Sequence, residues 1–275
     1  MAGSLYLVAT PIGNLQDMTF RSVEVLRTVE IIACEDTRHS IKLLNHFRIS
    51  NKLVSYHEHN EHERTDELID KMLAGASVAL ISDAGTPAIS DPGFVIVKAA
   101  IDAGIVVVPV PGAAAFVAAA ISSGLPTDAL LYGGFLPAKK GDRRRRLQEL
   151  TSVPATLVFY ESPHRIAKML SDCFEVLGNR RAAVARELTK LHEELVRGTL
   201  SELSTIATER LSKGELVIII ERSSKEALSN VHHDKLGERY AEMIAAGVDH
   251  KEALKKVAKK FGVKRADAYR QIQMR

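Results

Sequence analysis

Residues 78–93 read VALISDAGTPAISDPG, and this stretch decides the fold class of the chain. The first four residues are apolar, as in a buried strand, and the residues after Ile81 are rich in the Ser, Asp, Gly and Pro of a loop. Helical periodicity follows over Pro92–Ala103, and Gly104 stands where a helix C-cap is expected. A strand, a loop and a helix in this order form the repeating unit of a parallel α/β sheet.

The same unit recurs over the first 125 residues. Short apolar runs bounded by turn residues predict further strands at Leu5–Ala9, Glu30–Cys34, Leu53–Tyr56 and Ile105–Val108. Helical periodicity predicts crossover helices at Asp17–Thr28, His39–Phe47 and Glu61–Leu73. We therefore expect an N-terminal α/β domain over 1–125 with a mostly parallel sheet.

The character of the chain changes after Leu125. Strands are expected at Leu130–Phe135, Thr156–Tyr160, Ala182–Arg186 and Leu216–Glu221, with a helix at Pro163–Leu177 and an extended segment at His192–Gly198. This second alternation predicts a second α/β domain over 126–222. A polar stretch then leads into a small helical extension over 223–275.

Three helices are expected in that extension, at Leu236–Ala246, Lys251–Phe261 and Lys264–Gln273. The short turn at Gly262 fits a helix-turn-helix, whose last helix would face a nucleic-acid groove. A helical hairpin that only packs against the body of the protein has the same spacing, so both interpretations stay open.

The net charge of +3 is unevenly distributed. Residues 250–275 hold nine Lys or Arg and two Asp or Glu, a net charge of +7, which leaves −4 for residues 1–249. A basic tail and the basic run Lys139–Arg146 are the pattern expected of a nucleic-acid contact. A solvated helix face would account for the tail, and an exposed helix start neutralised by Glu149 would account for the run.

Composition limits where the chain acts. The 275 residues include only two cysteines, and their spacing is not typical of metal ligands. So few cysteines favour a reducing compartment such as the cytoplasm. The most apolar stretch, Ile105–Ile121, contains two prolines and a glycine, so we expect no membrane contact. The N-terminal apolar stretch has no basic region ahead of it and is interpreted as a strand rather than a signal peptide.

The run His57–His62 could hold zinc through its histidines and Glu61. No cysteine lies nearby and no HExxH is present, and polar loops of this composition are usually solvated. We therefore predict no metal.

Three loops are expected at the carboxyl edge of the first sheet, where open α/β folds bind ligands. They are Ala9–Asn14, Ser82–Gly93 and the turn Pro109–Gly112, which precedes three alanines. Neither GxGxxG nor a P-loop follows the first strand. A pocket lined by Gly and Ala without a phosphate cradle suits a ligand with no pyrophosphate, and S-adenosylmethionine is one.

Seven strings carry a family resemblance, in this order: VATPIGNLQDMT, EDTRHS, SDAGTPAISDPG, VPVPGAAA, GFLPAKKG, YESPHR and ARELTK. Together they resemble the tetrapyrrole-methylase superfamily and, within it, the branch of ribosomal RNA small subunit methyltransferase I. The resemblance runs from about Leu5 to Glu221, and the basic extension also fits that branch.

The resemblance implies a class III methyltransferase fold, with S-adenosylmethionine in the cleft between two α/β domains, and a homodimer. It implies 2′-O-methylation of the ribose of a cytidine in the decoding centre of 16S rRNA, within the small ribosomal subunit. The implied cofactor contacts are Pro11, Ile12, Gly13, Asp83, Gly85, Thr86, Ala88, Ala113, Ala114, Tyr160, Ala185 and Leu216.

A ribose hydroxyl is a poor nucleophile, so a base or a cation at the developing oxyanion would help the reaction. Candidates are Glu187, Lys190 and Asp36. Asp36 could instead only cap a helix, and Glu187 and Lys190 could form a structural ion pair. The candidate RNA contacts are Arg38, Lys139, Lys140, Arg143, Arg144, His164, Arg165, Lys259, Lys260, Lys264 and Arg265.

Two other functions remain alternatives. The same fold could methylate a small tetrapyrrole, or the chain could be a non-catalytic RNA-binding module. A tetrapyrrole enzyme needs neither the basic tail nor the arginine run, and a binding module needs no polar loops around a pocket.

Overall fold

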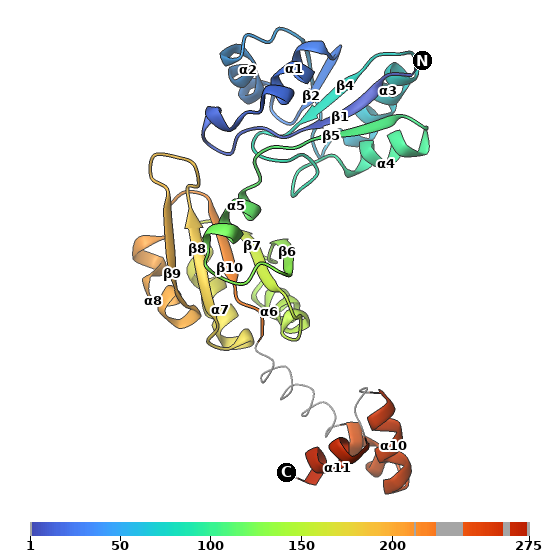
Figure 1. The fold of residues 1–275 in the computed structure, drawn as a ribbon, viewed down its shortest axis with the longest axis vertical. Helices are drawn as coiled ribbons and strands as arrows, with labels where there is room; N and C mark the ends of the chain where they lie inside the picture. Colours follow the sequence, from blue (N-terminus) through green and yellow to red (C-terminus); the bar gives the residue numbers. More distant parts are fainter. Residues whose placement is uncertain (1, 212, 224–238, 261–264, 274–275) are drawn as a thin grey trace.

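The computed structural model of the chain describes residues 2–211, 213–223, 239–260 and 265–273. Two α/β units follow each other along the chain, each built on a five-stranded sheet (Figure 1). Three helical segments of the described residues, at 239–245, 250–260 and 265–273, lie near the C-terminus. Nowhere in these ranges is a helix long and apolar enough to cross a membrane.

The first sheet is parallel throughout, in the order β3-β2-β4-β1-β5. Its strands are β1 (Ser4–Val8), β2 (Ile31–Cys34), β3 (Lys52–Ser55), β4 (Val78–Ile81) and β5 (Val106–Val110). The predicted parallel sheet is confirmed. Pro109 lies within β5, which is tolerated because β5 is an edge strand.

Helices cover both faces of this sheet. Helices α1 (Phe20–Thr28) and α2 (Thr37–His46) pack on one face, and α3 (Glu61–Leu73) and α4 (Phe94–Asp102) on the other. The helix expected from residue 17 begins only at Phe20, because the Thr19 hydroxyl accepts from Ser22 N at 3.0 Å and caps it. A short 3-10 turn, η1 (Leu15–Asp17), precedes it.

The second sheet is mixed, in the order β6-β7-β10-β8-β9. Its strands are β6 (Leu130–Phe135), β7 (Thr156–Glu161), β8 (Arg181–Arg186), β9 (Glu194–Thr199) and β10 (Leu216–Ile220). Only β6 and β7 are parallel, and the other pairs are antiparallel.

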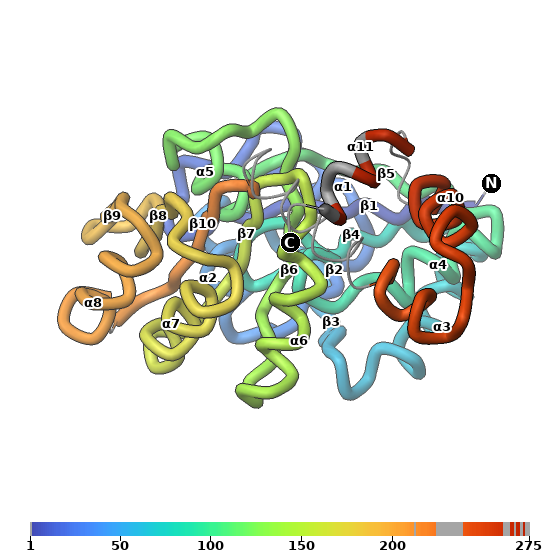
Figure 2. The backbone as a smooth tube through the Cα atoms, turned by 90° about the horizontal axis from the view of Figure 1, so that it is seen from below, coloured from blue at the N-terminus to red at the C-terminus, as the bar shows by residue number. Residues whose placement is uncertain are grey.

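Helices α6 (Lys140–Leu150), α7 (Ile166–Leu177) and α8 (Leu200–Arg210) cover one face of the second sheet. Helix α5 (Ala115–Ser122) covers the other face, as Figure 2 shows. Ala119 and Ala120 of α5 are fully buried there. This packing of α5 favours a division of the chain before residue 115, whereas the sequence pattern predicts it at 125.

The C-terminal helices are α10 (His250–Lys260) and α11 (Arg265–Gln273), with helical turns at 239–245 before them. Leu254, Val257, Ala258 and Ala268 form their own small apolar cluster, against which Tyr240 packs. The predicted Lys264 lies outside the described residues.

Candidate functional site

A cavity of about 380 Å³ lies between the two sheets. The first domain supplies Ile12 after β1 and the loop after β4, and α5 supplies its first residues. The second domain supplies the ends of β6 and β7 and the start of β10. The lining residues are Ile12, Ala84, Gly85, Thr86, Ile89, Ser90, Asp91, Ala114, Ala115, Phe116, Phe135, Tyr160, Glu161, Ser162, Pro163, Leu188, Gly214, Glu215, Leu216 and Val217.

Backbone contacts join the three loops at the edge of the first sheet. Thr10 and Gly85 exchange two backbone hydrogen bonds, of 2.8 and 3.1 Å. The Thr86 hydroxyl donates to the Ala113 carbonyl at 3.1 Å. A Cβ on Gly112 would come to 2.8 Å from that of Ala9, so the loops after β5 and β1 are in close contact. The predicted convergence of these loops follows from their adjacent strands, β4, β1 and β5.

The lining is acidic. It contains the carboxylates of Asp91, Glu161 and Glu215, and none of the described lining residues is Lys, Arg or His. Burial raises the pKa of Asp91 to about 6, and the negative charges of Glu35 and Asp83 add to the rise. The cavity therefore favours a ligand with positive charge and disfavours a phosphate.

An aromatic wall continues the cavity on the side of the second sheet. The Tyr160 ring contacts both Tyr132 and Phe135 edge-on, at centroid distances of 5.2 and 5.7 Å. The Tyr160 hydroxyl accepts from the backbone N of Phe116 at 3.3 Å, which ties α5 to β7. Tyr132 in turn bonds Ser90 through their hydroxyls at 2.5 Å, so the wall reaches the loop after β4.

The family model of the tetrapyrrole (corrin/porphyrin) methylases matches residues 4–204. The chain belongs to the tetrapyrrole methylase family. Ribosomal RNA small subunit methyltransferase I of Halalkalibacterium halodurans is 50% identical to this methylase, over 97% of the chain and 93% of the relative. The protein of the same name from Synechocystis sp. is 47% identical, over 97% of the chain and 96% of the relative.

A solved structure of uroporphyrin-III C-methyltransferase from Thermus thermophilus, complexed with S-adenosylhomocysteine, has the same fold. It superimposes with a TM-score of 0.55 over 79% of this methylase and 97% of its own chain, at 21% identity. At this identity the likeness concerns the fold, and it confirms the class III two-domain architecture that the sequence motifs imply.

The methylase brings together half of the residues implied to bind cofactor. Ile12, Gly85, Thr86, Ala114, Tyr160 and Leu216 line the cavity. Pro11, Gly13 and Asp83 line a separate hollow beside it. The Ala113 carbonyl accepts from Thr86 in the loop after β4, and Ala88 lies within the same loop with a φ of +64°. Ala185 is buried under α5.

Several lining residues were not predicted. Asp91 and Glu161 stand inside the strings SDAGTPAISDPG and YESPHR, so the sequence holds the signal, but their burial depends on tertiary contacts. Phe116 and Phe135 carried no signal, because an apolar residue in a helix or strand gives no indication that it faces a cavity.

Glu187 and Lys190 both contact Glu215, which lines the cavity, while Lys190 itself lines a neighbouring hollow. Lys190 Nζ is 2.9 Å from Glu187 Oε1 and 3.2 Å from Glu215 Oε2. The backbone N of Glu215 also donates to Glu187 Oε1, at 2.9 Å. This bond and Lys190 lower the pKa of Glu187, so its carboxylate is a weak base.

Asp36 is the N-cap of α2. Its Oδ1 accepts from the backbone N of Arg38 at 2.8 Å, and Oδ2 pairs with the Arg38 guanidinium at 2.8 Å. These contacts lower the pKa of Asp36 to about 2. The structure thus favours the capping interpretation of Asp36 over a role as base.

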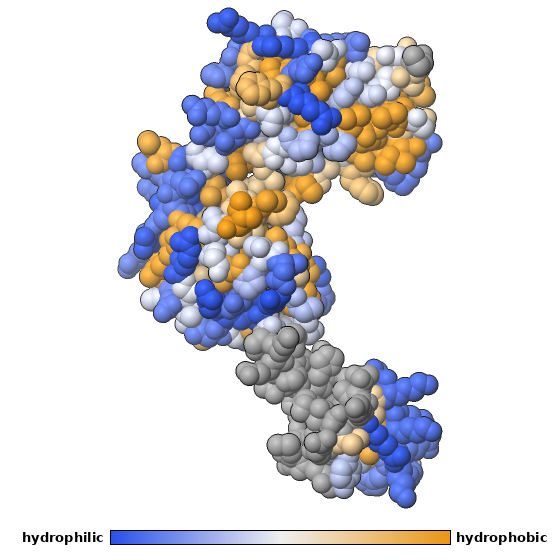
Figure 3. Space-filling view, in the orientation of Figure 1, coloured by the Kyte–Doolittle hydropathy of each residue, from blue (hydrophilic) through white to orange (hydrophobic). Residues whose placement is uncertain are grey.

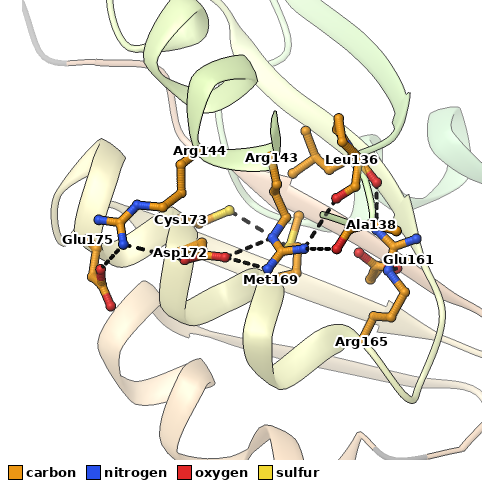
Figure 4. A network of polar contacts seen from close by, with 11 residues as sticks. Leu136, Ala138, Arg143, Arg144, Glu161, Arg165, Met169, Asp172, Cys173 and Glu175 are labelled. Carbon is orange, nitrogen blue, oxygen red and sulfur yellow. Dashed lines mark hydrogen bonds and ion pairs between the residues drawn. The ribbon is translucent and has the colours of Figure 1, made fainter. Parts of the chain in front are cut away.

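The arginine run does not form one exposed basic face. The prediction that Arg143 contacts RNA is contradicted, because its side chain is 6% exposed and pairs with the buried Asp172 at 2.5 Å (Figure 4). Arg143 Nη1 also donates to the carbonyls of Pro137 and Ala138. Arg143 therefore anchors the loop before α6 and is not available to a phosphate.

The other candidate RNA contacts differ in how free their charges are. Arg144 pairs with Glu175 at 2.7 Å, and Arg165 lies 3.1 Å from the buried Glu161 and donates to the Leu136 carbonyl (Figure 4). The exposed candidates are Arg38, Lys139, Lys140, His164, Lys259, Lys260 and Arg265.

Proposed function

We propose that this methylase transfers a methyl group from S-adenosylmethionine to the 2′-oxygen of a cytidine ribose in 16S rRNA, in the cytoplasm. The acidic, cation-free lining of the cavity carries this proposal. S-adenosylmethionine brings a sulfonium and an ammonium and no phosphate. Glu161 pairs with Arg165 and Glu215 with Lys190, so among the described lining residues Asp91 is the carboxylate left to attract this positive charge. The names of the full-length relatives support ribosomal RNA as the substrate.

The residues of the cavity fit this cofactor in size as well as in charge. Gly85, Ala114 and Ala115 leave the backbone open to close approach. The volume of about 380 Å³ is in the range of small-molecule sites. When bound, S-adenosylmethionine supplies an electrophilic methyl group, and the chain itself must align the acceptor and exclude water.

Within this reaction we assign Lys190 to the developing negative charge on the ribose oxygen or to the neighbouring phosphate. Its ammonium lies at the border of the cavity, and Glu187 acts as a positioning residue that holds it there. Asp91 is the proton acceptor best matched to neutral pH, because it lines the cavity and burial raises its pKa to about 6.

We also propose a homodimer. Phe94 and Ile101 of α4 are 73% and 61% exposed, and Val106 of the edge strand β5 is 62% exposed. Hydrophobic residues gather over α4 and β5 in Figure 3. Exposed apolar patches of this kind mark protein interfaces. Val106→Asp should convert a dimer into a monomer in sedimentation experiments, and a parent protein that sediments as a monomer would overturn this part.

The substrate is tested with methyl-labelled S-adenosylmethionine and three acceptors: unmethylated small ribosomal subunits, free 16S rRNA and a tetrapyrrole precursor. Label at one alkali-resistant cytidine position is the expected result. Ala114→Trp, which fills the cavity, should abolish both cofactor binding and transfer, whereas Lys168→Ala, at an exposed position of α7, should retain both. Label in the tetrapyrrole alone would overturn the proposal.

A further inference from the structure

The exposed face of α2 carries a group of cations that lies far along the sequence from both basic runs. Residues 37–48 contain no Asp or Glu. His39, Lys42 and His46 are exposed and spaced three and four residues apart, so they share one face of the helix. Arg48 follows the helix and is also exposed. Hydrophilic residues gather over this part of the first domain in Figure 3.

The charges of this face are free, unlike those of the arginine run. Among the described residues, neither Lys42 nor Arg48 has a carboxylate within ion-pair distance. Arg145 and Arg146 of α6, by contrast, pair with Asp142 and Glu149 in their own helix. An unpaired cation loses no protein partner when it binds a phosphate, so α2 is the better phosphate-binding surface.

Two surface hollows lie next to this face. One is lined by Gly13, His39, Lys42 and Asp83, and the other by Gly13, His46, Lys190 and Leu191. Both share the loop after β1, and the preceding residue in that loop, Ile12, lines the cavity. An RNA strand that lay along α2 would therefore pass next to Gly13, which is one residue away from Ile12 in the cavity wall.

The acidic groups near this face do not cancel its charge. Asp36 is neutralised by its pairing with Arg38, and Glu187 by its pairing with Lys190. Asp83 is the carboxylate that lines the hollow, and it accepts the backbone N–H of Asp36 at 3.2 Å. Glu193 of the 187–193 loop is a further exposed carboxylate, which accepts from the Thr189 backbone N at 2.5 Å. The surplus of positive charge therefore lies on the α2 side, where Lys42 and Arg48 stand against the carboxylate of Asp83.

We propose that the groove between α2 and the 187–193 loop binds the phosphodiester backbone of the RNA strand whose nucleotide enters the cavity. This inference rests on the proposed function and names the surface that guides its substrate. Lys42 and Arg48 contact phosphates directly. The apolar Leu191, which is 93% exposed at the same groove, is positioned to contact a sugar or base of the strand.

The test compares two double variants that remove the same charge, Lys42→Gln with Arg48→Gln and Lys168→Gln with Arg181→Gln. In the first pair, Lys42 lines one of the two hollows, and Arg48 is exposed two residues after His46, which lines the other. The second pair lies on exposed positions of the second domain. The dissociation constant for 16S rRNA is measured between 50 and 250 mM salt, together with cofactor affinity and thermal unfolding of each variant.

The groove variant should bind RNA roughly ten-fold more weakly, and the slope of log affinity against log salt should fall by about 0.7–0.9 for each lost phosphate contact. The cofactor affinity of the groove variant should equal that of the parent. In the control variant, both the RNA affinity and the salt slope should equal those of the parent. Unchanged RNA affinity and slope in the groove variant, with methylation intact, would overturn the groove but not the proposed function. A parent protein that neither binds nor methylates RNA would overturn both.

Discussion

The side chain of Lys190 lies directly over Gly13, so that a Cβ atom on Gly13 would come to 2.5 Å from Lys190 Cγ. This contact joins the loop after β1 of the first domain to the loop after β8 of the second. It occurs where the cavity and the α2 groove share a wall. The backbone of Gly13 has a φ of +149°, which other residues rarely adopt, so both its conformation and its lack of a side chain serve this contact.

Gly13→Ala should displace Lys190 from its contacts with Glu187 and Glu215, because the new methyl group would occupy the position of the lysine stem. We expect methyl transfer to fall about ten-fold, since Lys190 is assigned to stabilise the oxyanion. Single-turnover methylation measures the effect. Gly104→Ala is the control, because Gly104 has a φ of +71° and nothing within 4 Å of an added Cβ. Equal behaviour of the two variants would contradict the prediction.

Arg143→Met should destabilise the protein by about 3–5 kcal/mol, because the variant removes the close partner of the buried Asp172 carboxylate and leaves only Arg144, at 3.9 Å. The double variant Arg143→Met with Asp172→Leu should recover most of this free energy of unfolding. Urea denaturation measures both. Arg145→Ala is the control, since its side chain is 73% exposed and its removal should cost little. RNA affinity of folded Arg143→Met protein should match the parent, and a large loss would restore Arg143 as an RNA contact.

Asp91→Asn should alter how stability depends on pH. Burial raises the pKa of Asp91 to about 6, against about 3.9 in an unfolded chain. Between these values the folded protein binds more protons than the unfolded chain, so the parent loses stability as pH rises from about 4 to about 6. An asparagine at this position does not titrate, so the variant does not lose this stability. The free energy of unfolding of the variant, relative to that of the parent, should therefore rise by up to about 2 kcal/mol between pH 4.5 and 7.5.

Urea unfolding of the cofactor-free protein at these two pH values provides the measurement. Asp36→Asn serves as the control, because the pKa of Asp36 is lowered to about 2. The stability that the Asp36 carboxylate contributes is lost only as pH falls through that value. Its effect on stability should therefore be the same at pH 4.5 and 7.5. If Asp91→Asn behaves in the same way, the pKa of Asp91 is not raised in the folded protein.

Lys190→Met should lower the rate of methyl transfer roughly 100-fold, because it removes the cation that we assign to the developing charge on the ribose oxygen. Glu187→Gln should have a smaller effect, since it weakens the hold on Lys190 without removing it. Cofactor affinity, measured by calorimetry, should be unchanged in both. The split between kcat and KM distinguishes the roles, and parental kcat in both variants would exclude the pair from the mechanism.

Much of the architecture follows from local sequence. The apolar runs that end at Val8, Ile81 and Val110 are strands of the first sheet, and the Gly-, Pro- and Asp-rich loops after them meet because adjacent parallel strands end at one edge. Helix α8 was not predicted, although Thr199 and Glu202 form the capping box that signals its start. Few apolar residues mark its helical face, and so its periodicity is weak.

The sequence by itself determined the family, the two α/β units and the loops that surround the cavity, because hydrophobic period and turn chemistry act between near neighbours in the chain. Only the tertiary structure decided which charges are free. Arg143 is buried because Asp172 of α7 faces it, Lys42 is unpaired because no carboxylate of the described residues lies within ion-pair distance of it, and the pKa of Asp91 is raised because the cavity removes water from it. These properties depend on residues far away in sequence, since burial and charge pairing are set by the neighbours that folding provides.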